Sequence, residues 1–381
     1  MKPKTFMLIA GEASGDLLAA ELVSALRGGL PDATFFGAGG AKMSAAGVEL
    51  AFDLTQHSVI GISDVLKNYF KFRRLFHQLL ALAIERKPDV VIGVDYGGFN
   101  LRFGHTVKEY VRNNPFSKWN PKIVQFVSPQ VWASRPSRAN LLAADYDLLL
   151  SIFPFEKDWY AQRVPQLRVE FVGHPMVERM KSELRSQKSE VTATSPKILL
   201  LPGSRKSELQ RHLPVMLAAL KMIQEKLPTA KAKMVLPNQT LLQLAKSLGA
   251  NVEIQIGELP WALAEADVAI ASTGTVTMEC AFFGVPTVTL YKTSWFTYEI
   301  AKRIVTVKSL TMPNILAGEE IYPEFVQGDA TPENISRAAL ELLQDESRRT
   351  KIKSQLAKII SSLGEPGAAG RAASAILSLF K

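Results

Sequence analysis

The chain has 381 residues, of which 47% are hydrophobic and 21% are charged, a composition that is typical of a globular protein and gives enough chain for two domains. A single cysteine, Cys280, excludes a disulfide framework and a cysteine-based zinc site, and the 5 histidines show no metal-binding spacing. The formal net charge of +9 favours a phosphate-bearing or anionic partner, although an excess of solvated lysines explains it almost as well.

Short apolar runs alternate with longer amphipathic segments through the first half of the chain. The runs that we expect to form strands are Thr5 to Ala10, Val90 to Val94, Ile123 to Val127, Leu148 to Ile152 and Glu170 to Val172. This alternation predicts a parallel sheet covered by helices on both faces. Ligands of such sheets bind beyond the carboxyl ends of the strands, so the loops after these runs are the candidate site.

A second alternation follows the polar segment 181–196, which we predict to be an interdomain linker. Its expected strands are Ile198 to Leu201, Ala232 to Leu236, Val252 to Ile256, Val268 to Ala271 and Thr287 to Leu290. The chain is therefore predicted to be an α/β protein with two doubly wound, Rossmann-like domains, 1–180 and 197–350, facing a central cleft. Helices of 351–381 are expected to pack back on the first domain or on a partner subunit.

The stretch Val268 to Cys280, VAIASTGTVTMEC, predicts a strand, a glycine turn at Gly274 and Thr275, and the start of a helix. Such a turn leaves backbone N–H groups at the positive end of a helix dipole, which suits a diphosphate. Glu279, one turn into the helix, can accept hydrogen bonds from a ribose. The residues of this stretch fit equally well a plain strand-to-helix connection that a Ser or Thr caps.

Two other strand-end loops carry a charged side chain. Arg205 projects from the turn LPGSR, where a guanidinium can bind a diphosphate bidentately, although such turns are common. Asp95 follows Val90 to Val94 in the loop DYGG and can accept a proton from an attacking hydroxyl. An aspartate that only forms a turn before glycines fits the sequence equally well.

The loop GEASGD follows the first expected strand. Gly11 and Gly15 permit a tight turn close to a ligand. Ser14 and Asp16 either bind that ligand or cap the helix expected from Leu17 to Leu26.

Two more strand-end loops are candidates. In SPQVWASRPSR, which begins at Ser128, Trp132 stiffens a wall, and Arg135 and Arg138 either meet a phosphate or start a surface helix. His174 either bonds to a substrate or caps its strand.

The segment Asp64 to Arg86 predicts an amphipathic helix. Its main apolar face is formed by Val65, Tyr69, Phe72, Phe76, Leu79 and Leu80. Off that face, large apolar side chains alternate with basic ones: Leu66, Lys67, Phe70, Lys71, Arg74 and Leu75. This second group suits an anionic membrane surface or an acylated ligand, whereas a core helix with a solvated basic face is the simpler interpretation.

Several familiar motifs are absent or misplaced. Asp145 and Asp147 spell DxD, a metal-bridging signature of some nucleotide-sugar transferases, but they precede a strand and so lie at the wrong end for a ligand. The sequence has no GxxxxGK[ST], no complete GxGxxG and no GxSxG. These absences weaken the P-loop ATPase, dehydrogenase and α/β-hydrolase interpretations.

The strings GEASGD, DYGGFN, SPQVWA, LPGSR, STGTVTMEC and PNILAG occur in one order over nearly the whole chain. Together they resemble the lipid-A-disaccharide synthases, which are GT-B glycosyltransferases. The resemblance implies transfer of a sugar from UDP-2,3-diacylglucosamine to 2,3-diacylglucosamine 1-phosphate, with inversion and without metal, cofactor or nucleic acid. It also implies a cytoplasmic protein associated peripherally with an anionic inner-membrane surface, and it allows a homodimer with exchanged C-terminal tails.

The resemblance further implies a role for each matching residue. Asp95 would be the general base, and the UDP site would comprise Arg205, Gly274, Thr275, Glu279 and Asn314. The donor and acceptor sugars would face Gly11, Ser14, Gly15, Asp16, Ser128, Trp132 and His174. The helix at Asp64 to Arg86 would be the membrane-facing surface.

The sequence departs from the family pattern at Gly97, where a proline is frequent, and at Ser134, where a second aromatic residue is frequent. The first departure loosens the loop behind the expected base, and the second puts the acceptor contacts in doubt. Two other functions remain open at this point: a UDP-sugar 2-epimerase of the same architecture, and a nonenzymatic adaptor at a membrane surface.

Overall fold

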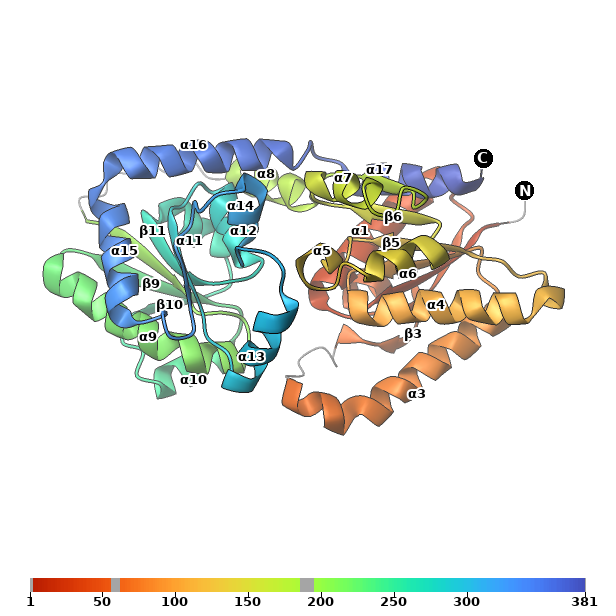
Figure 1. The fold of residues 1–381 in the computed structure, drawn as a ribbon, viewed down its shortest axis with the longest axis horizontal. Helices are drawn as coiled ribbons and strands as arrows, with labels where there is room; N and C mark the ends of the chain where they lie inside the picture. The colour runs from red at the N-terminus through yellow and green to blue at the C-terminus, as the bar shows by residue number, and fades with distance from the viewer. Residues whose placement is uncertain (1–2, 56–61, 186–194, 381) are drawn as a thin grey trace. The chain divides into compact units, whose positions relative to one another are not determined.

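The computed structural model describes residues 3–55, 62–185 and 195–380, with only the backbone described for 62–69 and 181–185. The chain divides into two compact units, one formed by 1–178 with 363–381 and the other by 179–362 (Figure 1). Each unit contains a parallel sheet flanked by helices and has its own apolar core. The predicted fold class, two Rossmann-like α/β domains, is confirmed.

The sheet of the first unit has the strand order β3-β2-β1-β4-β5-β6-β7. Its strands are β1 (Thr5–Ala10), β2 (Thr34–Gly39), β3 (Glu49–Asp53), β4 (Val90–Val94), β5 (Lys122–Phe126), β6 (Leu148–Ser151) and β7 (Val169–Phe171). The helices are α1 (Ala13–Gly29), α2 (Ala41–Ala45), α3 (Ile62–Arg86), α4 (Gly97–Asn113), α5 (Val131–Ser134), α6 (Arg138–Asp145), α7 (Pro154–Ala161), α17 (Ala368–Leu377) and the first part of α8 (Met176–Arg185).

The sequence did not predict β2 and β3. β2 reads TFFGAG, and its glycines hide the strand pattern. Gly37 has φ +151°, and a Cβ atom there would overlap the backbone of Leu8 in the neighbouring β1. The glycine that obscures the strand in the sequence is therefore the residue that lets β2 pair closely with β1.

The sheet of the second unit has the order β10-β9-β8-β11-β12-β13. Its strands are β8 (Lys197–Leu201), β9 (Lys231–Leu236), β10 (Glu253–Ile256), β11 (Val268–Ser272), β12 (Thr287–Tyr291) and β13 (Glu324–Val326), the last of which was not predicted. The helices are α9 (Lys206–Lys226), α10 (Gln239–Ser247), α11 (Leu259–Glu265), α12 (Val276–Phe282), α13 (Trp295–Ile304), α14 (Met312–Ala317), α15 (Pro332–Gln344) and α16 (Glu346–Ser362).

The C-terminal segment crosses back to the first unit later than we expected. α16 buries Ile352, Leu356 and Ile359 in the core of the second unit, so the expected boundary at 351 is wrong. The returning segment begins at Leu363, and its Phe380 ring lies 6.3 Å from that of Phe6 in β1. Of the expected linker 181–196, residues 181–185 belong to α8 and 186–194 lie outside the described residues.

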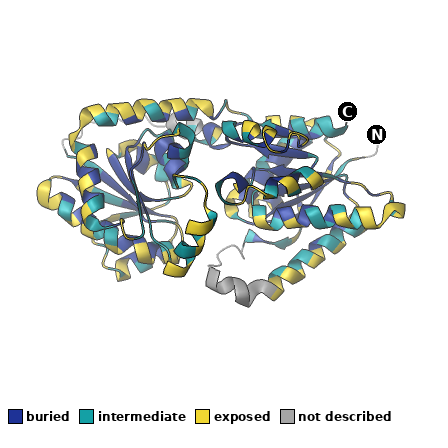
Figure 2. Cartoon of the chain, in the orientation of Figure 1, coloured by how far each residue is buried: buried dark blue, intermediate teal, exposed yellow. Residues whose placement is uncertain are grey.

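None of the helices in the described part of the chain combines the length and the apolar character that crossing a membrane requires. Figure 2 shows that buried residues concentrate in the two sheets, whereas the long helices carry exposed residues along their outer faces.

Candidate functional site: strand-end loops of both sheets

The loops after β1 and β4 lie side by side because these strands are paired, with Ala10 opposite Val94. A Cβ atom on Gly11 would overlap the ring of Tyr96. One on Gly15 would lie 3.3 Å from the carbonyl oxygen of Val94 and 3.6 Å from Cβ of Asp95. The two glycines therefore let the start of α1 approach the loop that carries Asp95, whereas their expected closeness to a ligand stays a prediction.

The loop at Asp95 has an unusual backbone. Asp95 and Tyr96 have φ +51° and +46°, and Val127, at the end of the neighbouring β5, has φ +67°. Left-handed backbone is costly for residues other than glycine, and most of all for a β-branched residue such as Val127. It persists only where the surrounding structure holds it, and such residues cluster at functional sites.

Two buried amides hold this backbone. Nε2 of Gln125 donates to the carbonyl oxygens of Asp95 (2.9 Å) and Val127 (3.1 Å). Nδ2 of Asn100 donates to the same Asp95 oxygen (2.8 Å). A Cβ atom on Gly93 would lie 2.6 Å from Oε1 of Gln125 and 2.8 Å from Cβ of Asn100, so the absence of a side chain there makes room for both amides.

Gln125, Asn100 and Gly93 were not predicted from the sequence to belong to the site. The one available signal was a polar residue inside an otherwise buried apolar strand, KIVQF. A buried polar side chain requires partners and so indicates a local structural task.

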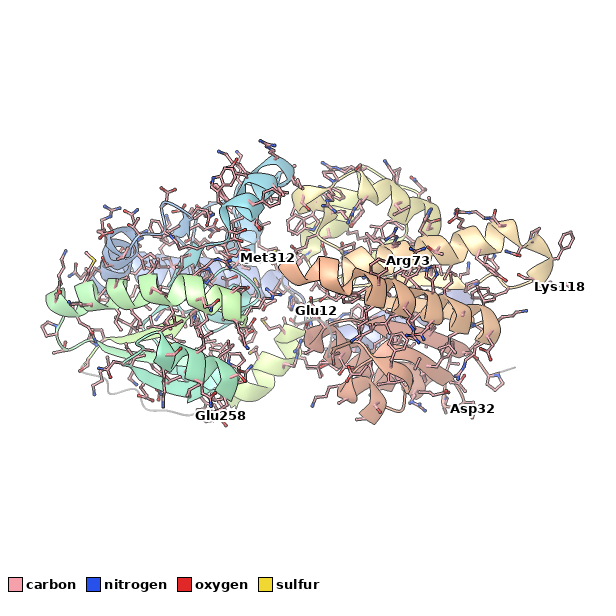
Figure 3. All side chains as sticks on the ribbon, turned by 90° about the horizontal axis from the view of Figure 1, so that it is seen from below. Glu12, Asp32, Arg73, Lys118, Glu258 and Met312 are labelled. Atoms are coloured by element: carbon pink, nitrogen blue, oxygen red, sulfur yellow. The ribbon has the colours of Figure 1, made fainter. Side chains whose placement is uncertain are left out.

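The carboxyl group of Asp95 is partly buried at the end of β4. Burial raises its pKa, and a hydrogen bond from the backbone of Tyr96 partly offsets that rise. A raised pKa makes a carboxylate a stronger proton acceptor, which suits a general base. Burial also raises the pKa of Tyr96, and the negative charge of Glu12, labelled in Figure 3, raises it further. The charge of Glu12 thus acts on Tyr96 beside Asp95, although no sequence pattern singled it out.

Asp16 has a structural role instead of the expected one in ligand binding. Its carboxylate is 4% exposed and accepts hydrogen bonds from the backbone N–H groups of Gly40 (2.7 Å), Lys42 (2.9 Å) and Met43 (3.1 Å). These groups start α2, so Asp16 caps a helix that is remote in the sequence. Ser14, by contrast, is exposed and stays a candidate.

The expected cleft residues Ser128 and Trp132 direct their polar groups into the unit. The hydroxyl of Ser128 lies 3.1 Å from that of Tyr160, and the indole N–H of Trp132 donates to Glu156 (3.0 Å). Burial raises the pKa of Glu156 to about 7, and the bond from Trp132 opposes that rise. The polar groups of these two side chains therefore stabilise the loop from within the unit, and the place of Ser128 and Trp132 in the cleft that faces the sugars stays a prediction.

His174 begins α8. Its Nδ1 accepts a hydrogen bond from the backbone N–H of Met176 (3.1 Å), so the side chain caps the start of the helix and not, as the alternative had it, the preceding strand. Gly97, one of the two departures from the family pattern, packs against Pro129, since a Cβ atom at Gly97 would lie 2.7 Å from Cβ of Pro129.

Both carboxylates of the DxD string are used in ion pairs. Asp145 is paired with His105 (2.7 Å) and Arg112 (2.8 Å), whereas Asp147 is paired with Lys108 and Lys122, both at 3.0 Å. The two aspartates of the DxD motif therefore stabilise the fold just before β6 begins.

In the second unit, the loops after β8 and β11 are adjacent because Leu201 pairs with Ala271. Gly274 has φ +143° and, together with Thr275, is exposed, and the Thr275 side chain makes no capping bond to α12. Beneath the turn, the buried Thr277 donates its hydroxyl hydrogen to the carbonyl of Gly274 (2.7 Å). Glu279 is partly exposed one turn later. The turn is thus exposed, which a diphosphate site requires.

Arg205 precedes α9 and its side chain is 64% exposed. Its guanidinium donates to Oε1 of Glu208 at 2.8 Å, while Oε2 of Glu208 accepts the backbone N–H groups of Ser204 (3.0 Å) and Arg205 (3.3 Å). Gly203, with φ +117°, leaves room for that carboxylate. Glu208 therefore orients the arginine at the surface, a role that sequence analysis did not assign.

His212 joins two strand-end loops from below. It is fully buried, its Nδ1 lies 2.8 Å from the carbonyl of Pro202, and its Nε2 accepts the backbone N–H of Lys292 (3.0 Å). These bonds require a neutral ring with the proton on Nδ1. Burial lowers the pKa of His212, which favours the same neutral form.

The predicted role of Asn314 as a nucleotide contact is wrong for its side chain. Asn314 is 1% exposed, its amide nitrogen donates to the carbonyl of Tyr322 and to Glu324, and its amide oxygen accepts the N–H groups of Ile321 and Tyr322, all at 2.8 Å. These four bonds use the hydrogen-bonding capacity of the amide. Asn314 therefore fixes the loop between α14 and β13.

The helix α3 was expected to carry the membrane-facing residues. Phe70 is 76% exposed, and Lys71 and Arg74 are exposed as well. Leu75, however, packs partly against the core, so its inclusion in the exposed group is wrong. Leu66 and Lys67 lie outside the residues whose side chains are described.

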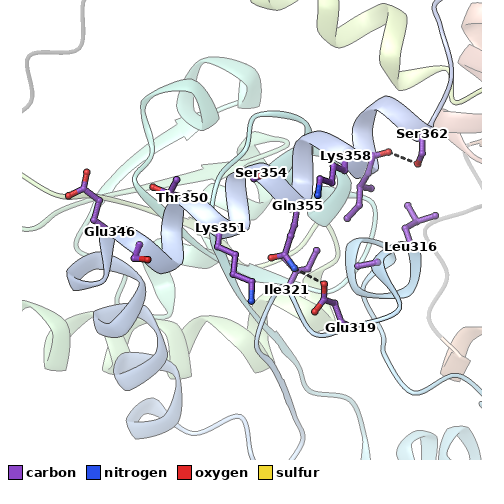
Figure 4. A pocket seen from close by; sticks show the side chains of 13 residues that line it. Leu316, Glu319, Ile321, Glu346, Thr350, Lys351, Ser354, Gln355, Lys358 and Ser362 are labelled. Atoms are coloured by element: carbon purple, nitrogen blue, oxygen red, sulfur yellow. Dashed lines mark hydrogen bonds between the residues drawn. The ribbon is translucent and has the colours of Figure 1, made fainter.

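A groove of about 1010 Å³ lies between α14 and α16 (Figure 4). Glu319, Lys351, Gln355 and Lys358 are among its lining residues, and Gln355 donates to Glu319 across it (2.6 Å). None of the predicted site residues lines this groove.

Comparison with known proteins finds the same family over the whole chain. A family model described as lipid-A-disaccharide synthetase matches residues 6–378. A lipid-A-disaccharide synthase from Trichlorobacter lovleyi is 36% identical, covering 100% of this chain and 98% of the relative. One from Myxococcus xanthus is 34% identical, covering 99% and 98%.

Solved structures share the two-sheet architecture at low identity. S. aureus MnaA, solved with UDP, matches with a TM-score of 0.64 at 15% identity, covering 99% of this chain and 97% of that one. The glycotransferase of kitacinnamycin matches with a TM-score of 0.64 at 16% identity, covering 100% of both chains. A UDP-GlcNAc 2-epimerase from Neisseria meningitidis matches at 0.61 with 14% identity and 99% coverage of both. At these identities the likeness extends to the fold alone.

Replacing Gln125 with leucine tests the buried amide. The variant removes the donor to the carbonyls of Asp95 and Val127, so we expect a loss of about 1–3 kcal/mol in local stability. The loss of local stability is measured by amide hydrogen exchange of the peptide that spans β4 and the loop after it. The exposed Gln130, changed to leucine, is the matched control. Equal exchange in both variants would contradict the role of Gln125.

The lowered pKa of His212 predicts a pH dependence of stability. Below about pH 6.5 the unfolded chain binds a proton that the folded chain does not, so the free energy of unfolding falls as the pH drops, until the folded-state pKa is reached. Urea denaturation between pH 5 and pH 8, as an approximate range around that value, measures the slope. The slope of the free energy of unfolding against pH is expected to flatten in His212→Asn. It is expected to persist in the control His77→Asn, in which an exposed histidine is changed. An unchanged slope in His212→Asn would refute the assignment.

Proposed function

The chain belongs to the lipid-A-disaccharide synthetase family and is a glycosyltransferase of lipid A disaccharide synthesis, and on that premise we propose its substrates and mechanism. The donor is UDP-2,3-diacylglucosamine and the acceptor is 2,3-diacylglucosamine 1-phosphate. The products are UDP and a β-1,6-linked disaccharide 1-phosphate. The observation that supports the proposal is the parallel pairing of β8 with β11, because the loop that carries Arg205 and the exposed turn at Gly274 then follow the same edge of the sheet.

The reaction we propose is a direct displacement at the anomeric carbon of the donor. Asp95 takes the proton from the 6-hydroxyl of the acceptor as that oxygen attacks, and the bond from the anomeric carbon to the diphosphate breaks. Attack from the face opposite the leaving group inverts the configuration. Burial raises the pKa of Asp95, which supports its assignment as the base.

The leaving UDP carries negative charge that the protein must stabilise. Arg205 supplies a positive charge, and the backbone at Gly274 and Thr275 supplies N–H donors, so the proposed mechanism requires no metal ion. Glu279 binds the ribose hydroxyls one turn into α12. Asn314 contributes only by fixing its loop, because its amide is fully used.

The first unit supplies the remaining contacts in this proposal. Ser14, which is exposed, faces the sugars next to Asp95, whereas the buried Gly11 and Gly15 only let this loop approach Asp95. Asp16, Ser128 and Trp132 hold these loops in shape. The chemistry requires the donor held by the second unit to reach Asp95 in the first.

A UDP-sugar 2-epimerase was the alternative with the same architecture. Epimerases occur among the similar solved structures, but at 14% to 18% identity they share the fold alone, whereas the curated synthases match over the full chain. The two reactions also differ in a simple requirement. Transfer releases UDP only when an acceptor is present, and epimerisation needs no acceptor.

Acylated substrates place the enzyme at a membrane surface in this proposal. Phe70, Lys71 and Arg74 of α3 combine an exposed aromatic ring with exposed positive charges. Rings of this kind insert at the boundary between headgroups and acyl chains, and basic residues are attracted to anionic lipids. We therefore place the protein at the cytoplasmic face of the inner membrane, bound peripherally.

Changing Asp95 to asparagine tests the base. We expect kcat to fall by about 10²–10⁴-fold, because the amide cannot accept the proton, while the Kd for UDP stays unchanged. The rate of UDP release, assayed with and without the acceptor, measures kcat. Calorimetry measures the Kd for UDP. The control is Asp32→Asn, an exposed aspartate of the same unit (Figure 3). UDP release without acceptor, or a wild-type rate in Asp95→Asn, would overturn the mechanism.

Changing Phe70 to serine tests the surface on α3. The variant loses the ring that inserts at the interface, so its partitioning onto vesicles that contain phosphatidylglycerol is expected to fall. The control is Phe116→Ser, since Phe116 is 97% exposed on the same unit but lies outside α3. Sedimentation with the vesicles compares the two variants. If both bind equally well, α3 is an ordinary solvated helix.

A further inference from the structure

The helix α13 is unusual because none of its residues is buried. Trp295 is 74% exposed, Phe296 67% and Ile300 43%, and the following residues Val305 and Leu310 are 36% and 38% exposed. In Figure 2 the helix has exposed and intermediate colours only. Most helices in proteins are stabilised by packing of an apolar face, and here that face is directed to solvent.

The segment is nevertheless held firmly at its start. The hydroxyl of Ser294 accepts the backbone N–H of Thr297 (3.2 Å) and so caps α13. Just before it, the backbone N–H of Thr293 donates to Oε1 of Gln327 (2.8 Å), and Nζ of Lys292 donates to the carbonyl of Gln327 (2.9 Å).

The segment is also fixed at its end. Glu324 accepts the backbone N–H groups of Leu310 (2.8 Å) and Thr311 (2.9 Å). Because both ends are tied to β13 or its adjoining loop, the exposed aromatic residues belong to an anchored element of the second unit. Large exposed apolar groups on such an element indicate an interaction surface.

The charges near these apolar groups define the partner. Lys302, Arg303 and Lys308 are exposed beside them, whereas the acidic residue of the segment is Glu299, which is partly exposed and lies four residues before Arg303. Basic residues therefore outnumber acidic ones. Trp and Phe rings with flanking Lys and Arg are the composition of a helix that lies in the interface of an anionic bilayer.

The position of α13 relative to the nucleotide site fits the same partner. α13 follows β12, which pairs with β11 so that Leu290 lies opposite Ser272. The carboxyl ends of these parallel strands share one edge of the sheet, and Gly274 and Thr275 lie at that edge. A donor that carries acyl chains needs its diphosphate at this edge while its chains remain in lipid.

We propose that 295–310, comprising α13 and the residues that follow it, is a membrane-docking surface that binds the second unit to an anionic bilayer. This inference rests on the proposed function, since it assigns the lipid side of the same site. It differs from the surface on α3, which belongs to the first unit. With both surfaces, each unit carries its own contact with the membrane.

The experiment uses the full chain with Trp295, Phe296 and Ile300 all changed to serine. We expect its dissociation constant for vesicles of phosphatidylethanolamine and phosphatidylglycerol to rise about tenfold or more, with the thermal unfolding midpoint unchanged because these side chains are exposed. The matched control is Trp261→Ser, since Trp261 is 48% exposed on α11 of the same unit. The control is expected to bind like the wild type.

A variant without the three exposed positive charges tests the electrostatic contribution to membrane binding. Changing Lys302, Arg303 and Lys308 to glutamine is expected to weaken binding to vesicles that contain phosphatidylglycerol and to leave binding to pure phosphatidylcholine vesicles unchanged. Equal losses on both kinds of vesicle, or no loss on either, would contradict the electrostatic part of the proposal.

Several results would overturn the docking surface. Wild-type vesicle binding by the serine variant would do so. So would a change of oligomeric state in analytical ultracentrifugation, which would make the face a contact between copies of the chain. A raised KM for the acylated donor with unchanged vesicle binding would assign the face to the acyl chains of the substrate.

Activity in detergent micelles separates this inference from the proposed function. The serine variant is expected to release UDP at the wild-type rate when both substrates are dispersed in detergent, because α13 carries none of the proposed catalytic groups. If the wild type releases no UDP under these conditions, the proposed function fails. If the wild type is active and only the serine variant is slow in micelles, the docking inference fails.

Discussion

The candidate site depends on one constraint, which is that the backbone at Asp95 must stay left-handed. The buried amides of Gln125 and Asn100 hold the carbonyl of Asp95, and Gly93 leaves the space in which they do so. The same Gln125 amide reaches Val127 on the neighbouring strand, so two strained strand ends share one donor. Burial around this loop is also what raises the pKa of the Asp95 carboxyl. Geometry and basicity thus have a common origin in the packing beneath the loop.

The second unit uses the same construction with other residues. The side chains of Glu208, Thr277 and His212 form hydrogen bonds with backbone atoms of the strand-end loops. Arg205 and Gly274 are thereby presented at the surface, where a ligand can reach them. In both units the side chains that shape the site are buried or intramolecularly bonded, and those available for chemistry are the ones left exposed or partly buried.

Apolar side chains at the surface form a further common feature. Phe70 on α3 and the aromatic residues of α13 are exposed beside basic residues, whereas the groove between α14 and α16 is lined largely by polar residues, none of which belongs to the predicted site. An enzyme whose substrates are amphiphilic must handle a diphosphate and acyl chains together. The combination of strand-end anion sites with exposed aromatic and basic helices meets both requirements.

The sequence by itself determined the class of the fold, most of the strands and the loops that carry Asp95, Arg205 and Gly274, because apolar periodicity and glycine placement act locally. Its ordered motifs also indicated the family to which the chain belongs. The sequence could not separate ligand residues from structural ones: Asp16, Trp132 and Asn314 resembled ligands and proved to be bonded internally. Nor did it reveal Gln125, Glu208 or the exposure of α13. Those features depend on which distant backbone groups the fold brings within hydrogen-bonding distance and which faces it leaves uncovered, and only the tertiary structure decides either.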